Sequence, residues 1–150
     1  MCGITGFIST QVSNPKEVIH NMIGTLLHRG PDNTSIWNDT NGVNMAHSRL
    51  SILDLSESGN QPIVSKSGRY VMVFNGEIYN YQELKKKIDS LISIQWSGSS
   101  DSEILIELID YFGIKEALIK TKGMFAISVW DAKEKKLTLC RDRLGEKPLY

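Results

Sequence analysis

Residues 70–81 read Tyr70-Val71-Met72-Val73-Phe74-Asn75-Gly76-Glu77-Ile78-Tyr79-Asn80-Tyr81. The first half is an apolar run rich in β-branched and aromatic side chains, which predicts a strand over residues 70–74. Asn-Gly is the strongest short signal for a type I′ hairpin turn, but the residues after it lead toward a helix rather than a returning strand. Asn75 and Gly76 therefore have two interpretations: a hairpin turn, or an amide and an N–H that point the same way and stabilise an oxyanion.

Strands and helices are predicted on both sides of this stretch. Before it we expect a strand at 4–8, a helix from Asn14-Pro15 to about Arg29-Gly30-Pro31, strands at 35–37 and 43–49, and a loop over 56–68. After it we expect a helix at 81–92, a brief strand at 93–96, a helix from Ser100 to Gly113, one or two helical turns to Lys120, and a hairpin of 124–130 with 136–140. This order predicts an α+β fold of mostly antiparallel sheets.

The composition is that of one globular domain. Apolar residues make up 41% of the 150 positions, and 17 Lys and Arg balance 17 Asp and Glu. The zero net charge argues against a nucleic-acid or membrane-surface partner. No stretch reaches the ~18 apolar residues of a transmembrane helix, and the N-terminus does not have the pattern of a signal peptide. Two cysteines make no disulfide framework, so we expect a cytoplasmic protein.

Cys2 has the most unusual position in the chain. Methionine is normally removed from a new chain when the next side chain is small, and that would leave a thiol and a free α-amine on Cys2. The amine can then serve as the base for the thiol, as in other N-terminal nucleophiles. On position alone, an inert buried cysteine is the alternative, and Cys140 is predicted to be only a packing residue.

Three charged residues have structural and functional interpretations. Arg49 lies in an apolar run and needs a carboxylate partner, either a structural acid or a substrate. Asp101 stands where a helix cap is expected, and Glu77 is a solvated surface residue unless both acids converge on an amine. The three histidines and two cysteines have no metal-site spacing, and no phosphate-binding glycine motif is present.

Together, these segments resemble a known family. Met1-Cys2-Gly3-Ile4-Thr5-Gly6-Phe7 resembles the N-terminus of class II glutamine amidotransferases. Further motifs resemble the asparagine-synthetase branch, in order and at comparable spacing, and the resemblance runs from Cys2 to Tyr150. These motifs are His28-Arg29-Gly30-Pro31-Asp32, Arg49-Leu50-Ser51-Ile52-Leu53-Asp54, Asn60-Gln61-Pro62, Phe74-Asn75-Gly76-Glu77-Ile78-Tyr79-Asn80, Gly123-Met124-Phe125-Ala126 and Arg141-Asp142-Arg143-Leu144-Gly145.

The resemblance implies the four-layer αββα sandwich of antiparallel sheets found in N-terminal nucleophile hydrolases. It implies that Cys2 is the nucleophile with its own amine as base. It also implies that the Asn75 side chain and the Gly76 N–H form the oxyanion hole.

The resemblance also implies a substrate site without a metal. Arg49 would bind the α-carboxylate of glutamine, and Glu77 and Asp101 would bind its α-ammonium. Leu50 and Ile52 are expected to complete this site together with Asn75. A leucine after Arg49 favours the asparagine-synthetase branch, because the sugar-phosphate and phosphoribosyl branches usually carry Trp there.

The implied activity is hydrolysis of glutamine to glutamate and ammonia through a cysteine thioester. The ammonia would serve an ATP-dependent amidation, that of aspartate to asparagine in this branch. Two alternatives stay open: the same glutaminase could serve another acid, such as a sugar carboxylate in surface-polysaccharide synthesis, or the domain could be non-catalytic.

The resemblance also sets expectations for cofactors and partners. No cofactor is expected in residues 1–150, which the resemblance marks as a glutaminase domain incomplete at its C-terminus. ATP and Mg are expected in a synthetase domain outside these residues. The expected partners are glutamine and that synthetase domain, with a homodimer left open, and no nucleic acid or membrane.

Overall fold

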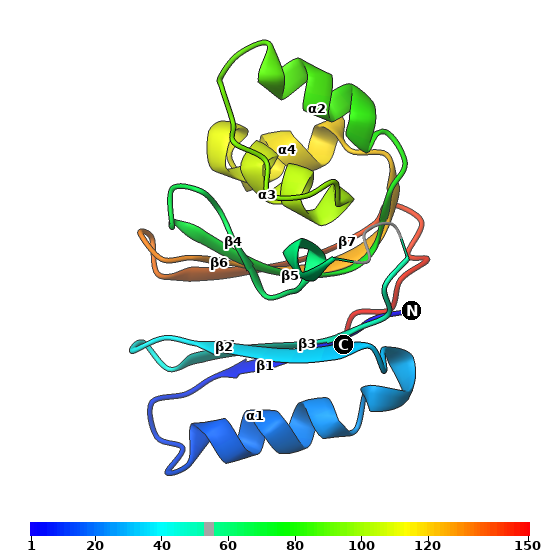
Figure 1. Ribbon diagram of the computed structural model, residues 1–150. Helices are drawn as coiled ribbons and strands as arrows, with labels where there is room; N and C mark the ends of the chain where they lie inside the picture. Colours follow the sequence, from blue (N-terminus) through cyan, green and yellow to red (C-terminus); the bar gives the residue numbers. More distant parts are fainter. Residues whose placement is uncertain (53–55) are drawn as a thin grey trace.

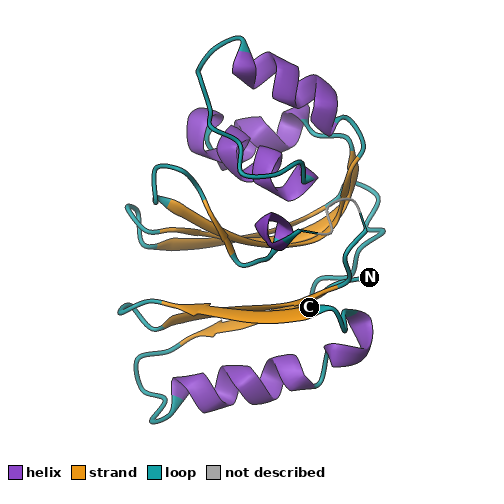
Figure 2. Cartoon of the chain, viewed as in Figure 1, coloured by secondary structure: helices purple, strands orange, loops and turns teal. Residues whose placement is uncertain are grey.

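Two antiparallel sheets face each other, and helices cover their outer faces. The computed structural model describes residues 1–52 and 56–150, so Leu53 and Asp54 of the predicted motif lie outside the described residues. Figures 1 and 2 show the layer order as α1, three-stranded sheet, four-stranded sheet, and then helices α2 to α4. The predicted α+β fold and the four-layer αββα sandwich are confirmed.

The first sheet has the order β1-β3-β2, and the second has the order β4-β5-β6-β7. All neighbouring strands are antiparallel. The strands are β1 Gly3–Ile8, β2 Asn33–Asn38, β3 Val43–Arg49, β4 Ile63–Val64, β5 Tyr70–Ile78, β6 Gly123–Asp131 and β7 Lys136–Arg141. The helices are α1 Pro15–Gly24, α2 Tyr81–Asp89, α3 Asp101–Phe112 and α4 Ile114–Lys120, with 3-10 turns η1 Leu27–Arg29 and η2 Glu57–Gly59.

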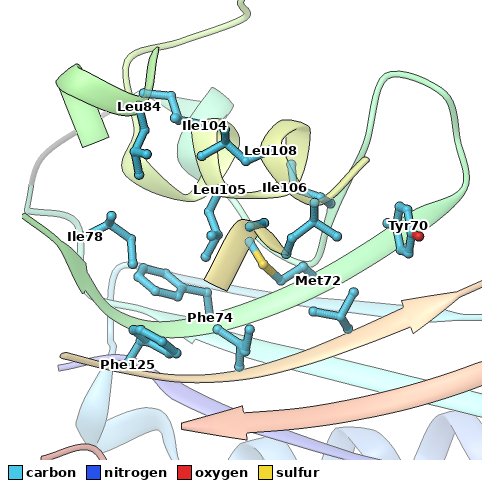
Figure 3. Packing of buried hydrophobic residues seen from close by; sticks show 14 of the residues in the cluster. Tyr70, Met72, Phe74, Ile78, Leu84, Ile104, Leu105, Ile106, Leu108 and Phe125 are labelled. Carbon is cyan, nitrogen blue, oxygen red and sulfur yellow. The ribbon is translucent and has the colours of Figure 1, made fainter. Parts of the chain in front are cut away.

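Alternation along β5 divides its side chains between two cores. Met72, Phe74 and Ile78 pack against the helices, where Figure 3 shows them beside residues of α3. Val71 and Val73 pack instead between the sheets. Since side chains of a strand alternate between its faces, Asn75 and Glu77 continue the row of Val71 and Val73 toward the first sheet.

Strand β3 has the matching pattern. Val43 and Met45 pack between the sheets, while Ala46 packs on the opposite face against α1. The same alternation directs His47 and Arg49 into the layer between the sheets. The apolar inter-sheet core therefore ends in polar side chains contributed by both sheets.

Several local predictions were wrong. Of the two interpretations of Asn75-Gly76, the hairpin turn is the one that does not form, because β6 pairs with every residue of β5 and the strand runs on to Ile78. The first helix ends at Gly24 rather than near Arg29, and a separate 3-10 turn follows it. The predicted loop 56–68 contains η2 and the short strand β4, which pairs with Val71 and Met72.

The segment after α2 also differs from its prediction. The helix ends at Asp89, and residues 93–96 form no strand. Instead, Ile94 and Trp96 pack against the core between the second sheet and the helices. Trp96 Nε1 also donates a hydrogen bond to Asp89 (2.9 Å). The apolar residues that indicated a strand thus cover the end of α2. Among the described residues, no helix is long and apolar enough to cross a bilayer.

Candidate active site

A pocket of about 120 Å³ opens where the inter-sheet layer ends. All eight residues predicted for the site line it, although they come from the N-terminus, β3 and the residues after it, β5 and α3. The lining residues are Met1, Cys2, His47, Arg49, Leu50, Ile52, Gly59, Gln61, Phe74, Asn75, Gly76, Glu77, Ser100, Asp101, Ser102, Met124 and Lys147.

The half-buried Cys2 thiol is held at the end of β3. Its Sγ accepts a hydrogen bond from Leu50 N (3.4 Å) and lies 3.7 Å from Leu50 O, to which the S–H donates. Arg29 Nε donates to the carbonyl oxygen of Cys2 (3.1 Å) and fixes the backbone beside it. The register Gly3↔Ser48 places Cys2 next to Arg49 on the face that Ile4 shares.

The Arg49 guanidinium is fixed by uncharged groups of the loop after β3. Its Nη1 donates to Ser56 O (2.7 Å) and to Asn60 Oδ1 (2.8 Å). Gly59 lies directly against the guanidinium, and a Cβ there would collide with Nη2. The carboxylate partner that the sequence predicts for Arg49 stays a prediction.

On the edge of β5 that faces away from β6, three backbone N–H groups make no hydrogen bond to β6. They belong to Phe74, Gly76 and Ile78. Tyr79 N donates to Lys122 O (2.7 Å). In this register the backbone N–H and C=O groups of odd-numbered residues of β5 point toward β6, and those of even-numbered residues point away from it. Phe74 N donates to Gln61 Oε1 (2.6 Å) and Ile78 N to Asp101 Oδ2 (2.8 Å).

The Gly76 N–H lies between these two N–H groups and is directed toward the same edge. A side chain at position 76 would meet the backbone of β6 at Met124 and Phe125, so the close pairing requires glycine. The neighbouring Asn75 side chain is buried, and within residues 1–52 and 56–150 its amide makes no hydrogen bond. Two hydrogen-bond donors of adjacent residues thus line the pocket.

Asp101 is the first residue of α3, but it is not the cap. Ser100 caps the helix by accepting a hydrogen bond from Glu103 N (3.2 Å), so the capping interpretation of Asp101 was wrong. Burial raises the pKa of Asp101, the N–H groups of Ile78 and Ser102 oppose the rise, and the charge of Glu77 adds to it. The Glu77 side chain is half-buried, and both acids line the pocket.

Several residues near the pocket had no assigned role in the sequence interpretation, among them Gln61, Asn60, Arg29 and His47. The Gln61 side chain accepts a hydrogen bond from β5, and the Asn60 side chain accepts one from Arg49. Arg29 donates a hydrogen bond to the backbone of Cys2. Only folding brings these distant segments together, so spacing alone could not find them. His47 did carry a signal, because it lies two residues before Arg49 and shares its face of the strand.

The His47 ring is buried with 1% of its surface exposed. Neither ring nitrogen makes a hydrogen bond to a described residue. Burial lowers the pKa of His47 to about 4, the nearby Phe74 backbone opposes this shift, and the charge of Arg49 adds to it. At neutral pH the ring is therefore uncharged.

This burial predicts a loss of stability in weak acid. The unfolded chain takes up a proton at the ordinary pKa of 6.5, whereas the folded ring resists protonation down to about 4. Between about pH 7.5 and pH 4.5, His47 should therefore cost roughly 2–3 kcal/mol of unfolding free energy, at 1.36 kcal/mol per pKa unit. Urea unfolding of wild type and His47→Gln at both pH values measures this loss.

The exposed His20 provides the control for this experiment. His20→Gln should keep the wild-type pH dependence, and His47→Gln should lack the part that His47 contributes. Equal pH dependence in all three proteins would show that the buried ring has no part in it.

Known proteins resemble this chain along its whole length. The family model described as a glutamine amidotransferase domain matches residues 1–150. The chain belongs to this glutamine amidotransferase family. It is 36% identical to asparagine synthetase [glutamine-hydrolyzing] 3 of Bacillus subtilis (strain 168) and 37% identical to amidase chry2 of Gibberella zeae, and each match covers all of this chain and 24% of the relative. The chain thus spans about a quarter of these relatives.

A solved structure shares the fold. Glutamine phosphoribosylpyrophosphate (PRPP) amidotransferase from B. subtilis, complexed with ADP and GMP, superposes with a TM-score of 0.69 at 20% identity. The match covers 94% of this chain and 36% of that structure. This likeness supports the sandwich fold of N-terminal nucleophile enzymes, whereas the family model and the relatives show a class II glutamine amidotransferase domain. In the described part of this domain, no cluster of His, Cys, Asp and Glu is arranged to hold a metal ion.

Proposed function

We propose that this amidotransferase pocket hydrolyses glutamine to glutamate and ammonia through a thioester on Cys2. The observation that carries the proposal is the convergence of three kinds of group on one small pocket. These are a thiol on residue two, the paired donors of Asn75 and Gly76, and a cation with two acids. Such a set matches the reacting amide and both charged ends of an amino acid.

In the proposed reaction, removal of Met1 frees the α-amine of Cys2. The amine accepts the thiol proton while Sγ forms a bond to the side-chain carbonyl carbon of glutamine. Asn75 and Gly76 donate hydrogen bonds to the resulting oxyanion. The C–N bond then breaks, and the amine returns the proton to the leaving nitrogen, which departs as ammonia.

Water completes the cycle. The amine takes a proton from water as the water oxygen attacks the thioester carbon, and the C–S bond breaks. The proton returns to the sulfur, and glutamate leaves. Each step uses the same base and the same two donors, so one site serves both halves of the reaction.

Arg49, Glu77 and Asp101 are proposed to bind the two charged ends of glutamine. Arg49 presents a forked donor to the α-carboxylate, and the two acids accept from the α-ammonium. Leu50 and Ile52 line the same pocket and would contact the substrate beside Arg49. A site built for both charges should reject simple amides.

Gly59→Ala tests the proposed role of Arg49 without changing that residue. The added methyl group displaces the guanidinium, so KM for glutamine should rise about tenfold or more, with a smaller change in kcat. Gly24→Ala is the control, because a Cβ at Gly24 meets nothing within 4 Å. Steady-state glutamate release measures both variants, and equal KM values would contradict the assignment.

The ammonia is proposed to serve an ATP-dependent amidation in the full-length protein, with aspartate as acceptor. The matches to asparagine synthetases support this acceptor. ATP and Mg²⁺ would then bind in residues outside this chain. The match to amidase chry2 supports the second candidate, in which the same glutaminase serves a different acid.

The acceptor is tested with the full-length protein. It should form asparagine from aspartate and ATP with either glutamine or ammonium as nitrogen source. If asparagine does not form but glutamate is released, the acceptor is another acid, and a panel of sugar and amino-acid carboxylates identifies it by ATP consumption. If no glutamate is released under any condition, the proposed glutaminase itself is wrong.

A further inference from the structure

Lys147 is a buried cation that the proposed reaction does not use. It lines the pocket with only 5% of its surface exposed, although it lies far from the other site residues in sequence. Its Nζ contacts the sulfur of Met1 at 2.9 Å. Figure 1 shows the C-terminal segment returning to the end of the sandwich where the N-terminus lies.

The loop that carries Lys147 is anchored by a single carboxylate. Burial alone would raise the pKa of Asp142, but surrounding backbone N–H groups lower it to about 2. Asp142 is therefore charged throughout the physiological range, and the loop has a fixed path. Its carboxylate accepts hydrogen bonds from the N–H groups of Phe125, Leu144, Glu146 and Lys147 at 2.9–3.2 Å.

The Lys147 ammonium differs from the paired lysines of the protein. Lys66, Lys85 and Lys120 each lie within 3.6 Å of a carboxylate oxygen. No carboxylate in the described ranges lies within ion-pair distance of Lys147 Nζ. The side-chain hydrogen bond of this nitrogen goes to the thioether sulfur of Met1. Within the described residues this buried ammonium therefore has no acidic partner, an arrangement that costs free energy, and its place in the pocket needs an explanation.

The position of Met1 locates this charge relative to the proposed base. Five covalent bonds separate the Met1 sulfur from Cys2 N, so Lys147 Nζ lies no more than about 9 Å from that nitrogen. Removal of Met1 turns this amide nitrogen into an α-amine. An ammonium at such a distance makes a second positive charge on the amine less favourable.

Other charged or titratable side chains also face the N-terminus. The acids favour a protonated amine and the arginines oppose it, while the His47 ring is neutral. In the proposed complex the acids bind the substrate ammonium, which removes much of their effect on the base. These residues are Arg29 from η1, His47 and Arg49 from β3, Glu77 from β5 and Asp101 from α3.

We propose that Lys147 is a positioning residue that keeps the freed α-amine of Cys2 in its uncharged, proton-accepting form. This inference rests on the proposed function, because it needs the amine to act as the base. A protonated amine cannot take the proton of the thiol, and an ordinary α-amine is largely protonated at neutral pH. The fixed charge of Lys147 increases the uncharged fraction at the pH where the enzyme works.

The test is the pH profile of glutaminase kcat in the full-length protein, because kcat reports the ionisation of groups in the complex with substrate. In Lys147→Met, which keeps the length of the side chain without the charge, the acid limb should move up by about one pH unit. At high pH, where the amine is uncharged in any case, activity should stay within about threefold of wild type. Lys147→Arg retains the charge and should retain the wild-type acid limb.

Lys133→Met controls for general loss of positive charge, because Lys133 is exposed in the turn between β6 and β7. It should have the wild-type profile. If Lys147→Met does not fold, as judged by circular dichroism, Lys147→Gln replaces it with the same expected shift. An unmoved acid limb, or an equal loss of activity at every pH, overturns the proposed role.

A separate comparison distinguishes this inference from the proposed function. Cys2→Ala that still releases glutamate at the wild-type rate overturns the function itself. Activity that depends on Cys2 but has the same acid limb with and without the Lys147 charge overturns only the role of Lys147.

Discussion

Cys2→Ala should lower the rate of glutamate release from glutamine by roughly 10⁴-fold or more, the scale expected when a covalent nucleophile is removed. Alanine fits wherever cysteine fits, and among the described residues the thiol hydrogen-bonds only to the backbone of Leu50, so the fold should be retained. Measurements with the full-length protein should show that ammonium still supports amide formation in the variant. The nucleophile is needed only to release ammonia from glutamine.

The other cysteine gives a matched control. Cys140 is half-buried in β7, and burial raises the pKa of its thiol, which makes it a poor nucleophile. Cys140→Ala should release glutamate at nearly the wild-type rate. Comparable rates in wild type and Cys2→Ala would remove the thiol from the mechanism.

Asn75→Ala should lower kcat for glutamine hydrolysis by roughly 10²–10³-fold with little change in KM, because one oxyanion donor contributes on this scale. The amide is not part of a described hydrogen-bond network, so its removal leaves no partner unsatisfied. The expected loss lies in the transition state, where the oxygen carries its full charge. Single-turnover rates of glutamate formation measure it.

Asn44→Ala is the control for Asn75→Ala. Asn44 is also a buried asparagine of an inner strand, but it does not line the pocket. Its kcat should stay within about threefold of wild type. A loss in Asn75→Ala that appears entirely in KM would assign the amide to substrate binding instead of the oxyanion.

Much of the fold follows from patterns in the sequence. The strand at 43–49 has the predicted bounds, and the Asn14-Pro15 start of α1 has the predicted cap, in which Asn14 Oδ1 accepts from Glu17 N. The period of two along β3 and β5 also explains why Arg49, Asn75 and Glu77 line one pocket between the sheets. Such local and periodic signals are available before any tertiary contact is known.

Other features depended on tertiary contacts that patterns do not contain. Asn75-Gly76 has strong turn chemistry, yet pairing with β6 keeps it in an extended strand. Asp101 begins a helix, but its carboxylate accepts a hydrogen bond from the N–H of Ile78 in β5. This bond holds the carboxylate against β5 at the pocket. Lys147 lines the pocket from a loop whose backbone N–H groups bind the Asp142 carboxylate. In each case a long-range contact overrides a local preference.

The central claim is that the sulfur of the mature first residue becomes covalently bonded to the glutamyl group. The most direct test mixes the full-length protein with glutamine, quenches the reaction in acid within milliseconds to seconds, and maps the peptides by mass spectrometry. We predict an N-terminal peptide that begins at Cys2, without Met1, and carries one glutamyl group that hydroxylamine removes. Glutamate release by a protein that retains Met1, or an adduct on any residue other than Cys2, would contradict the account.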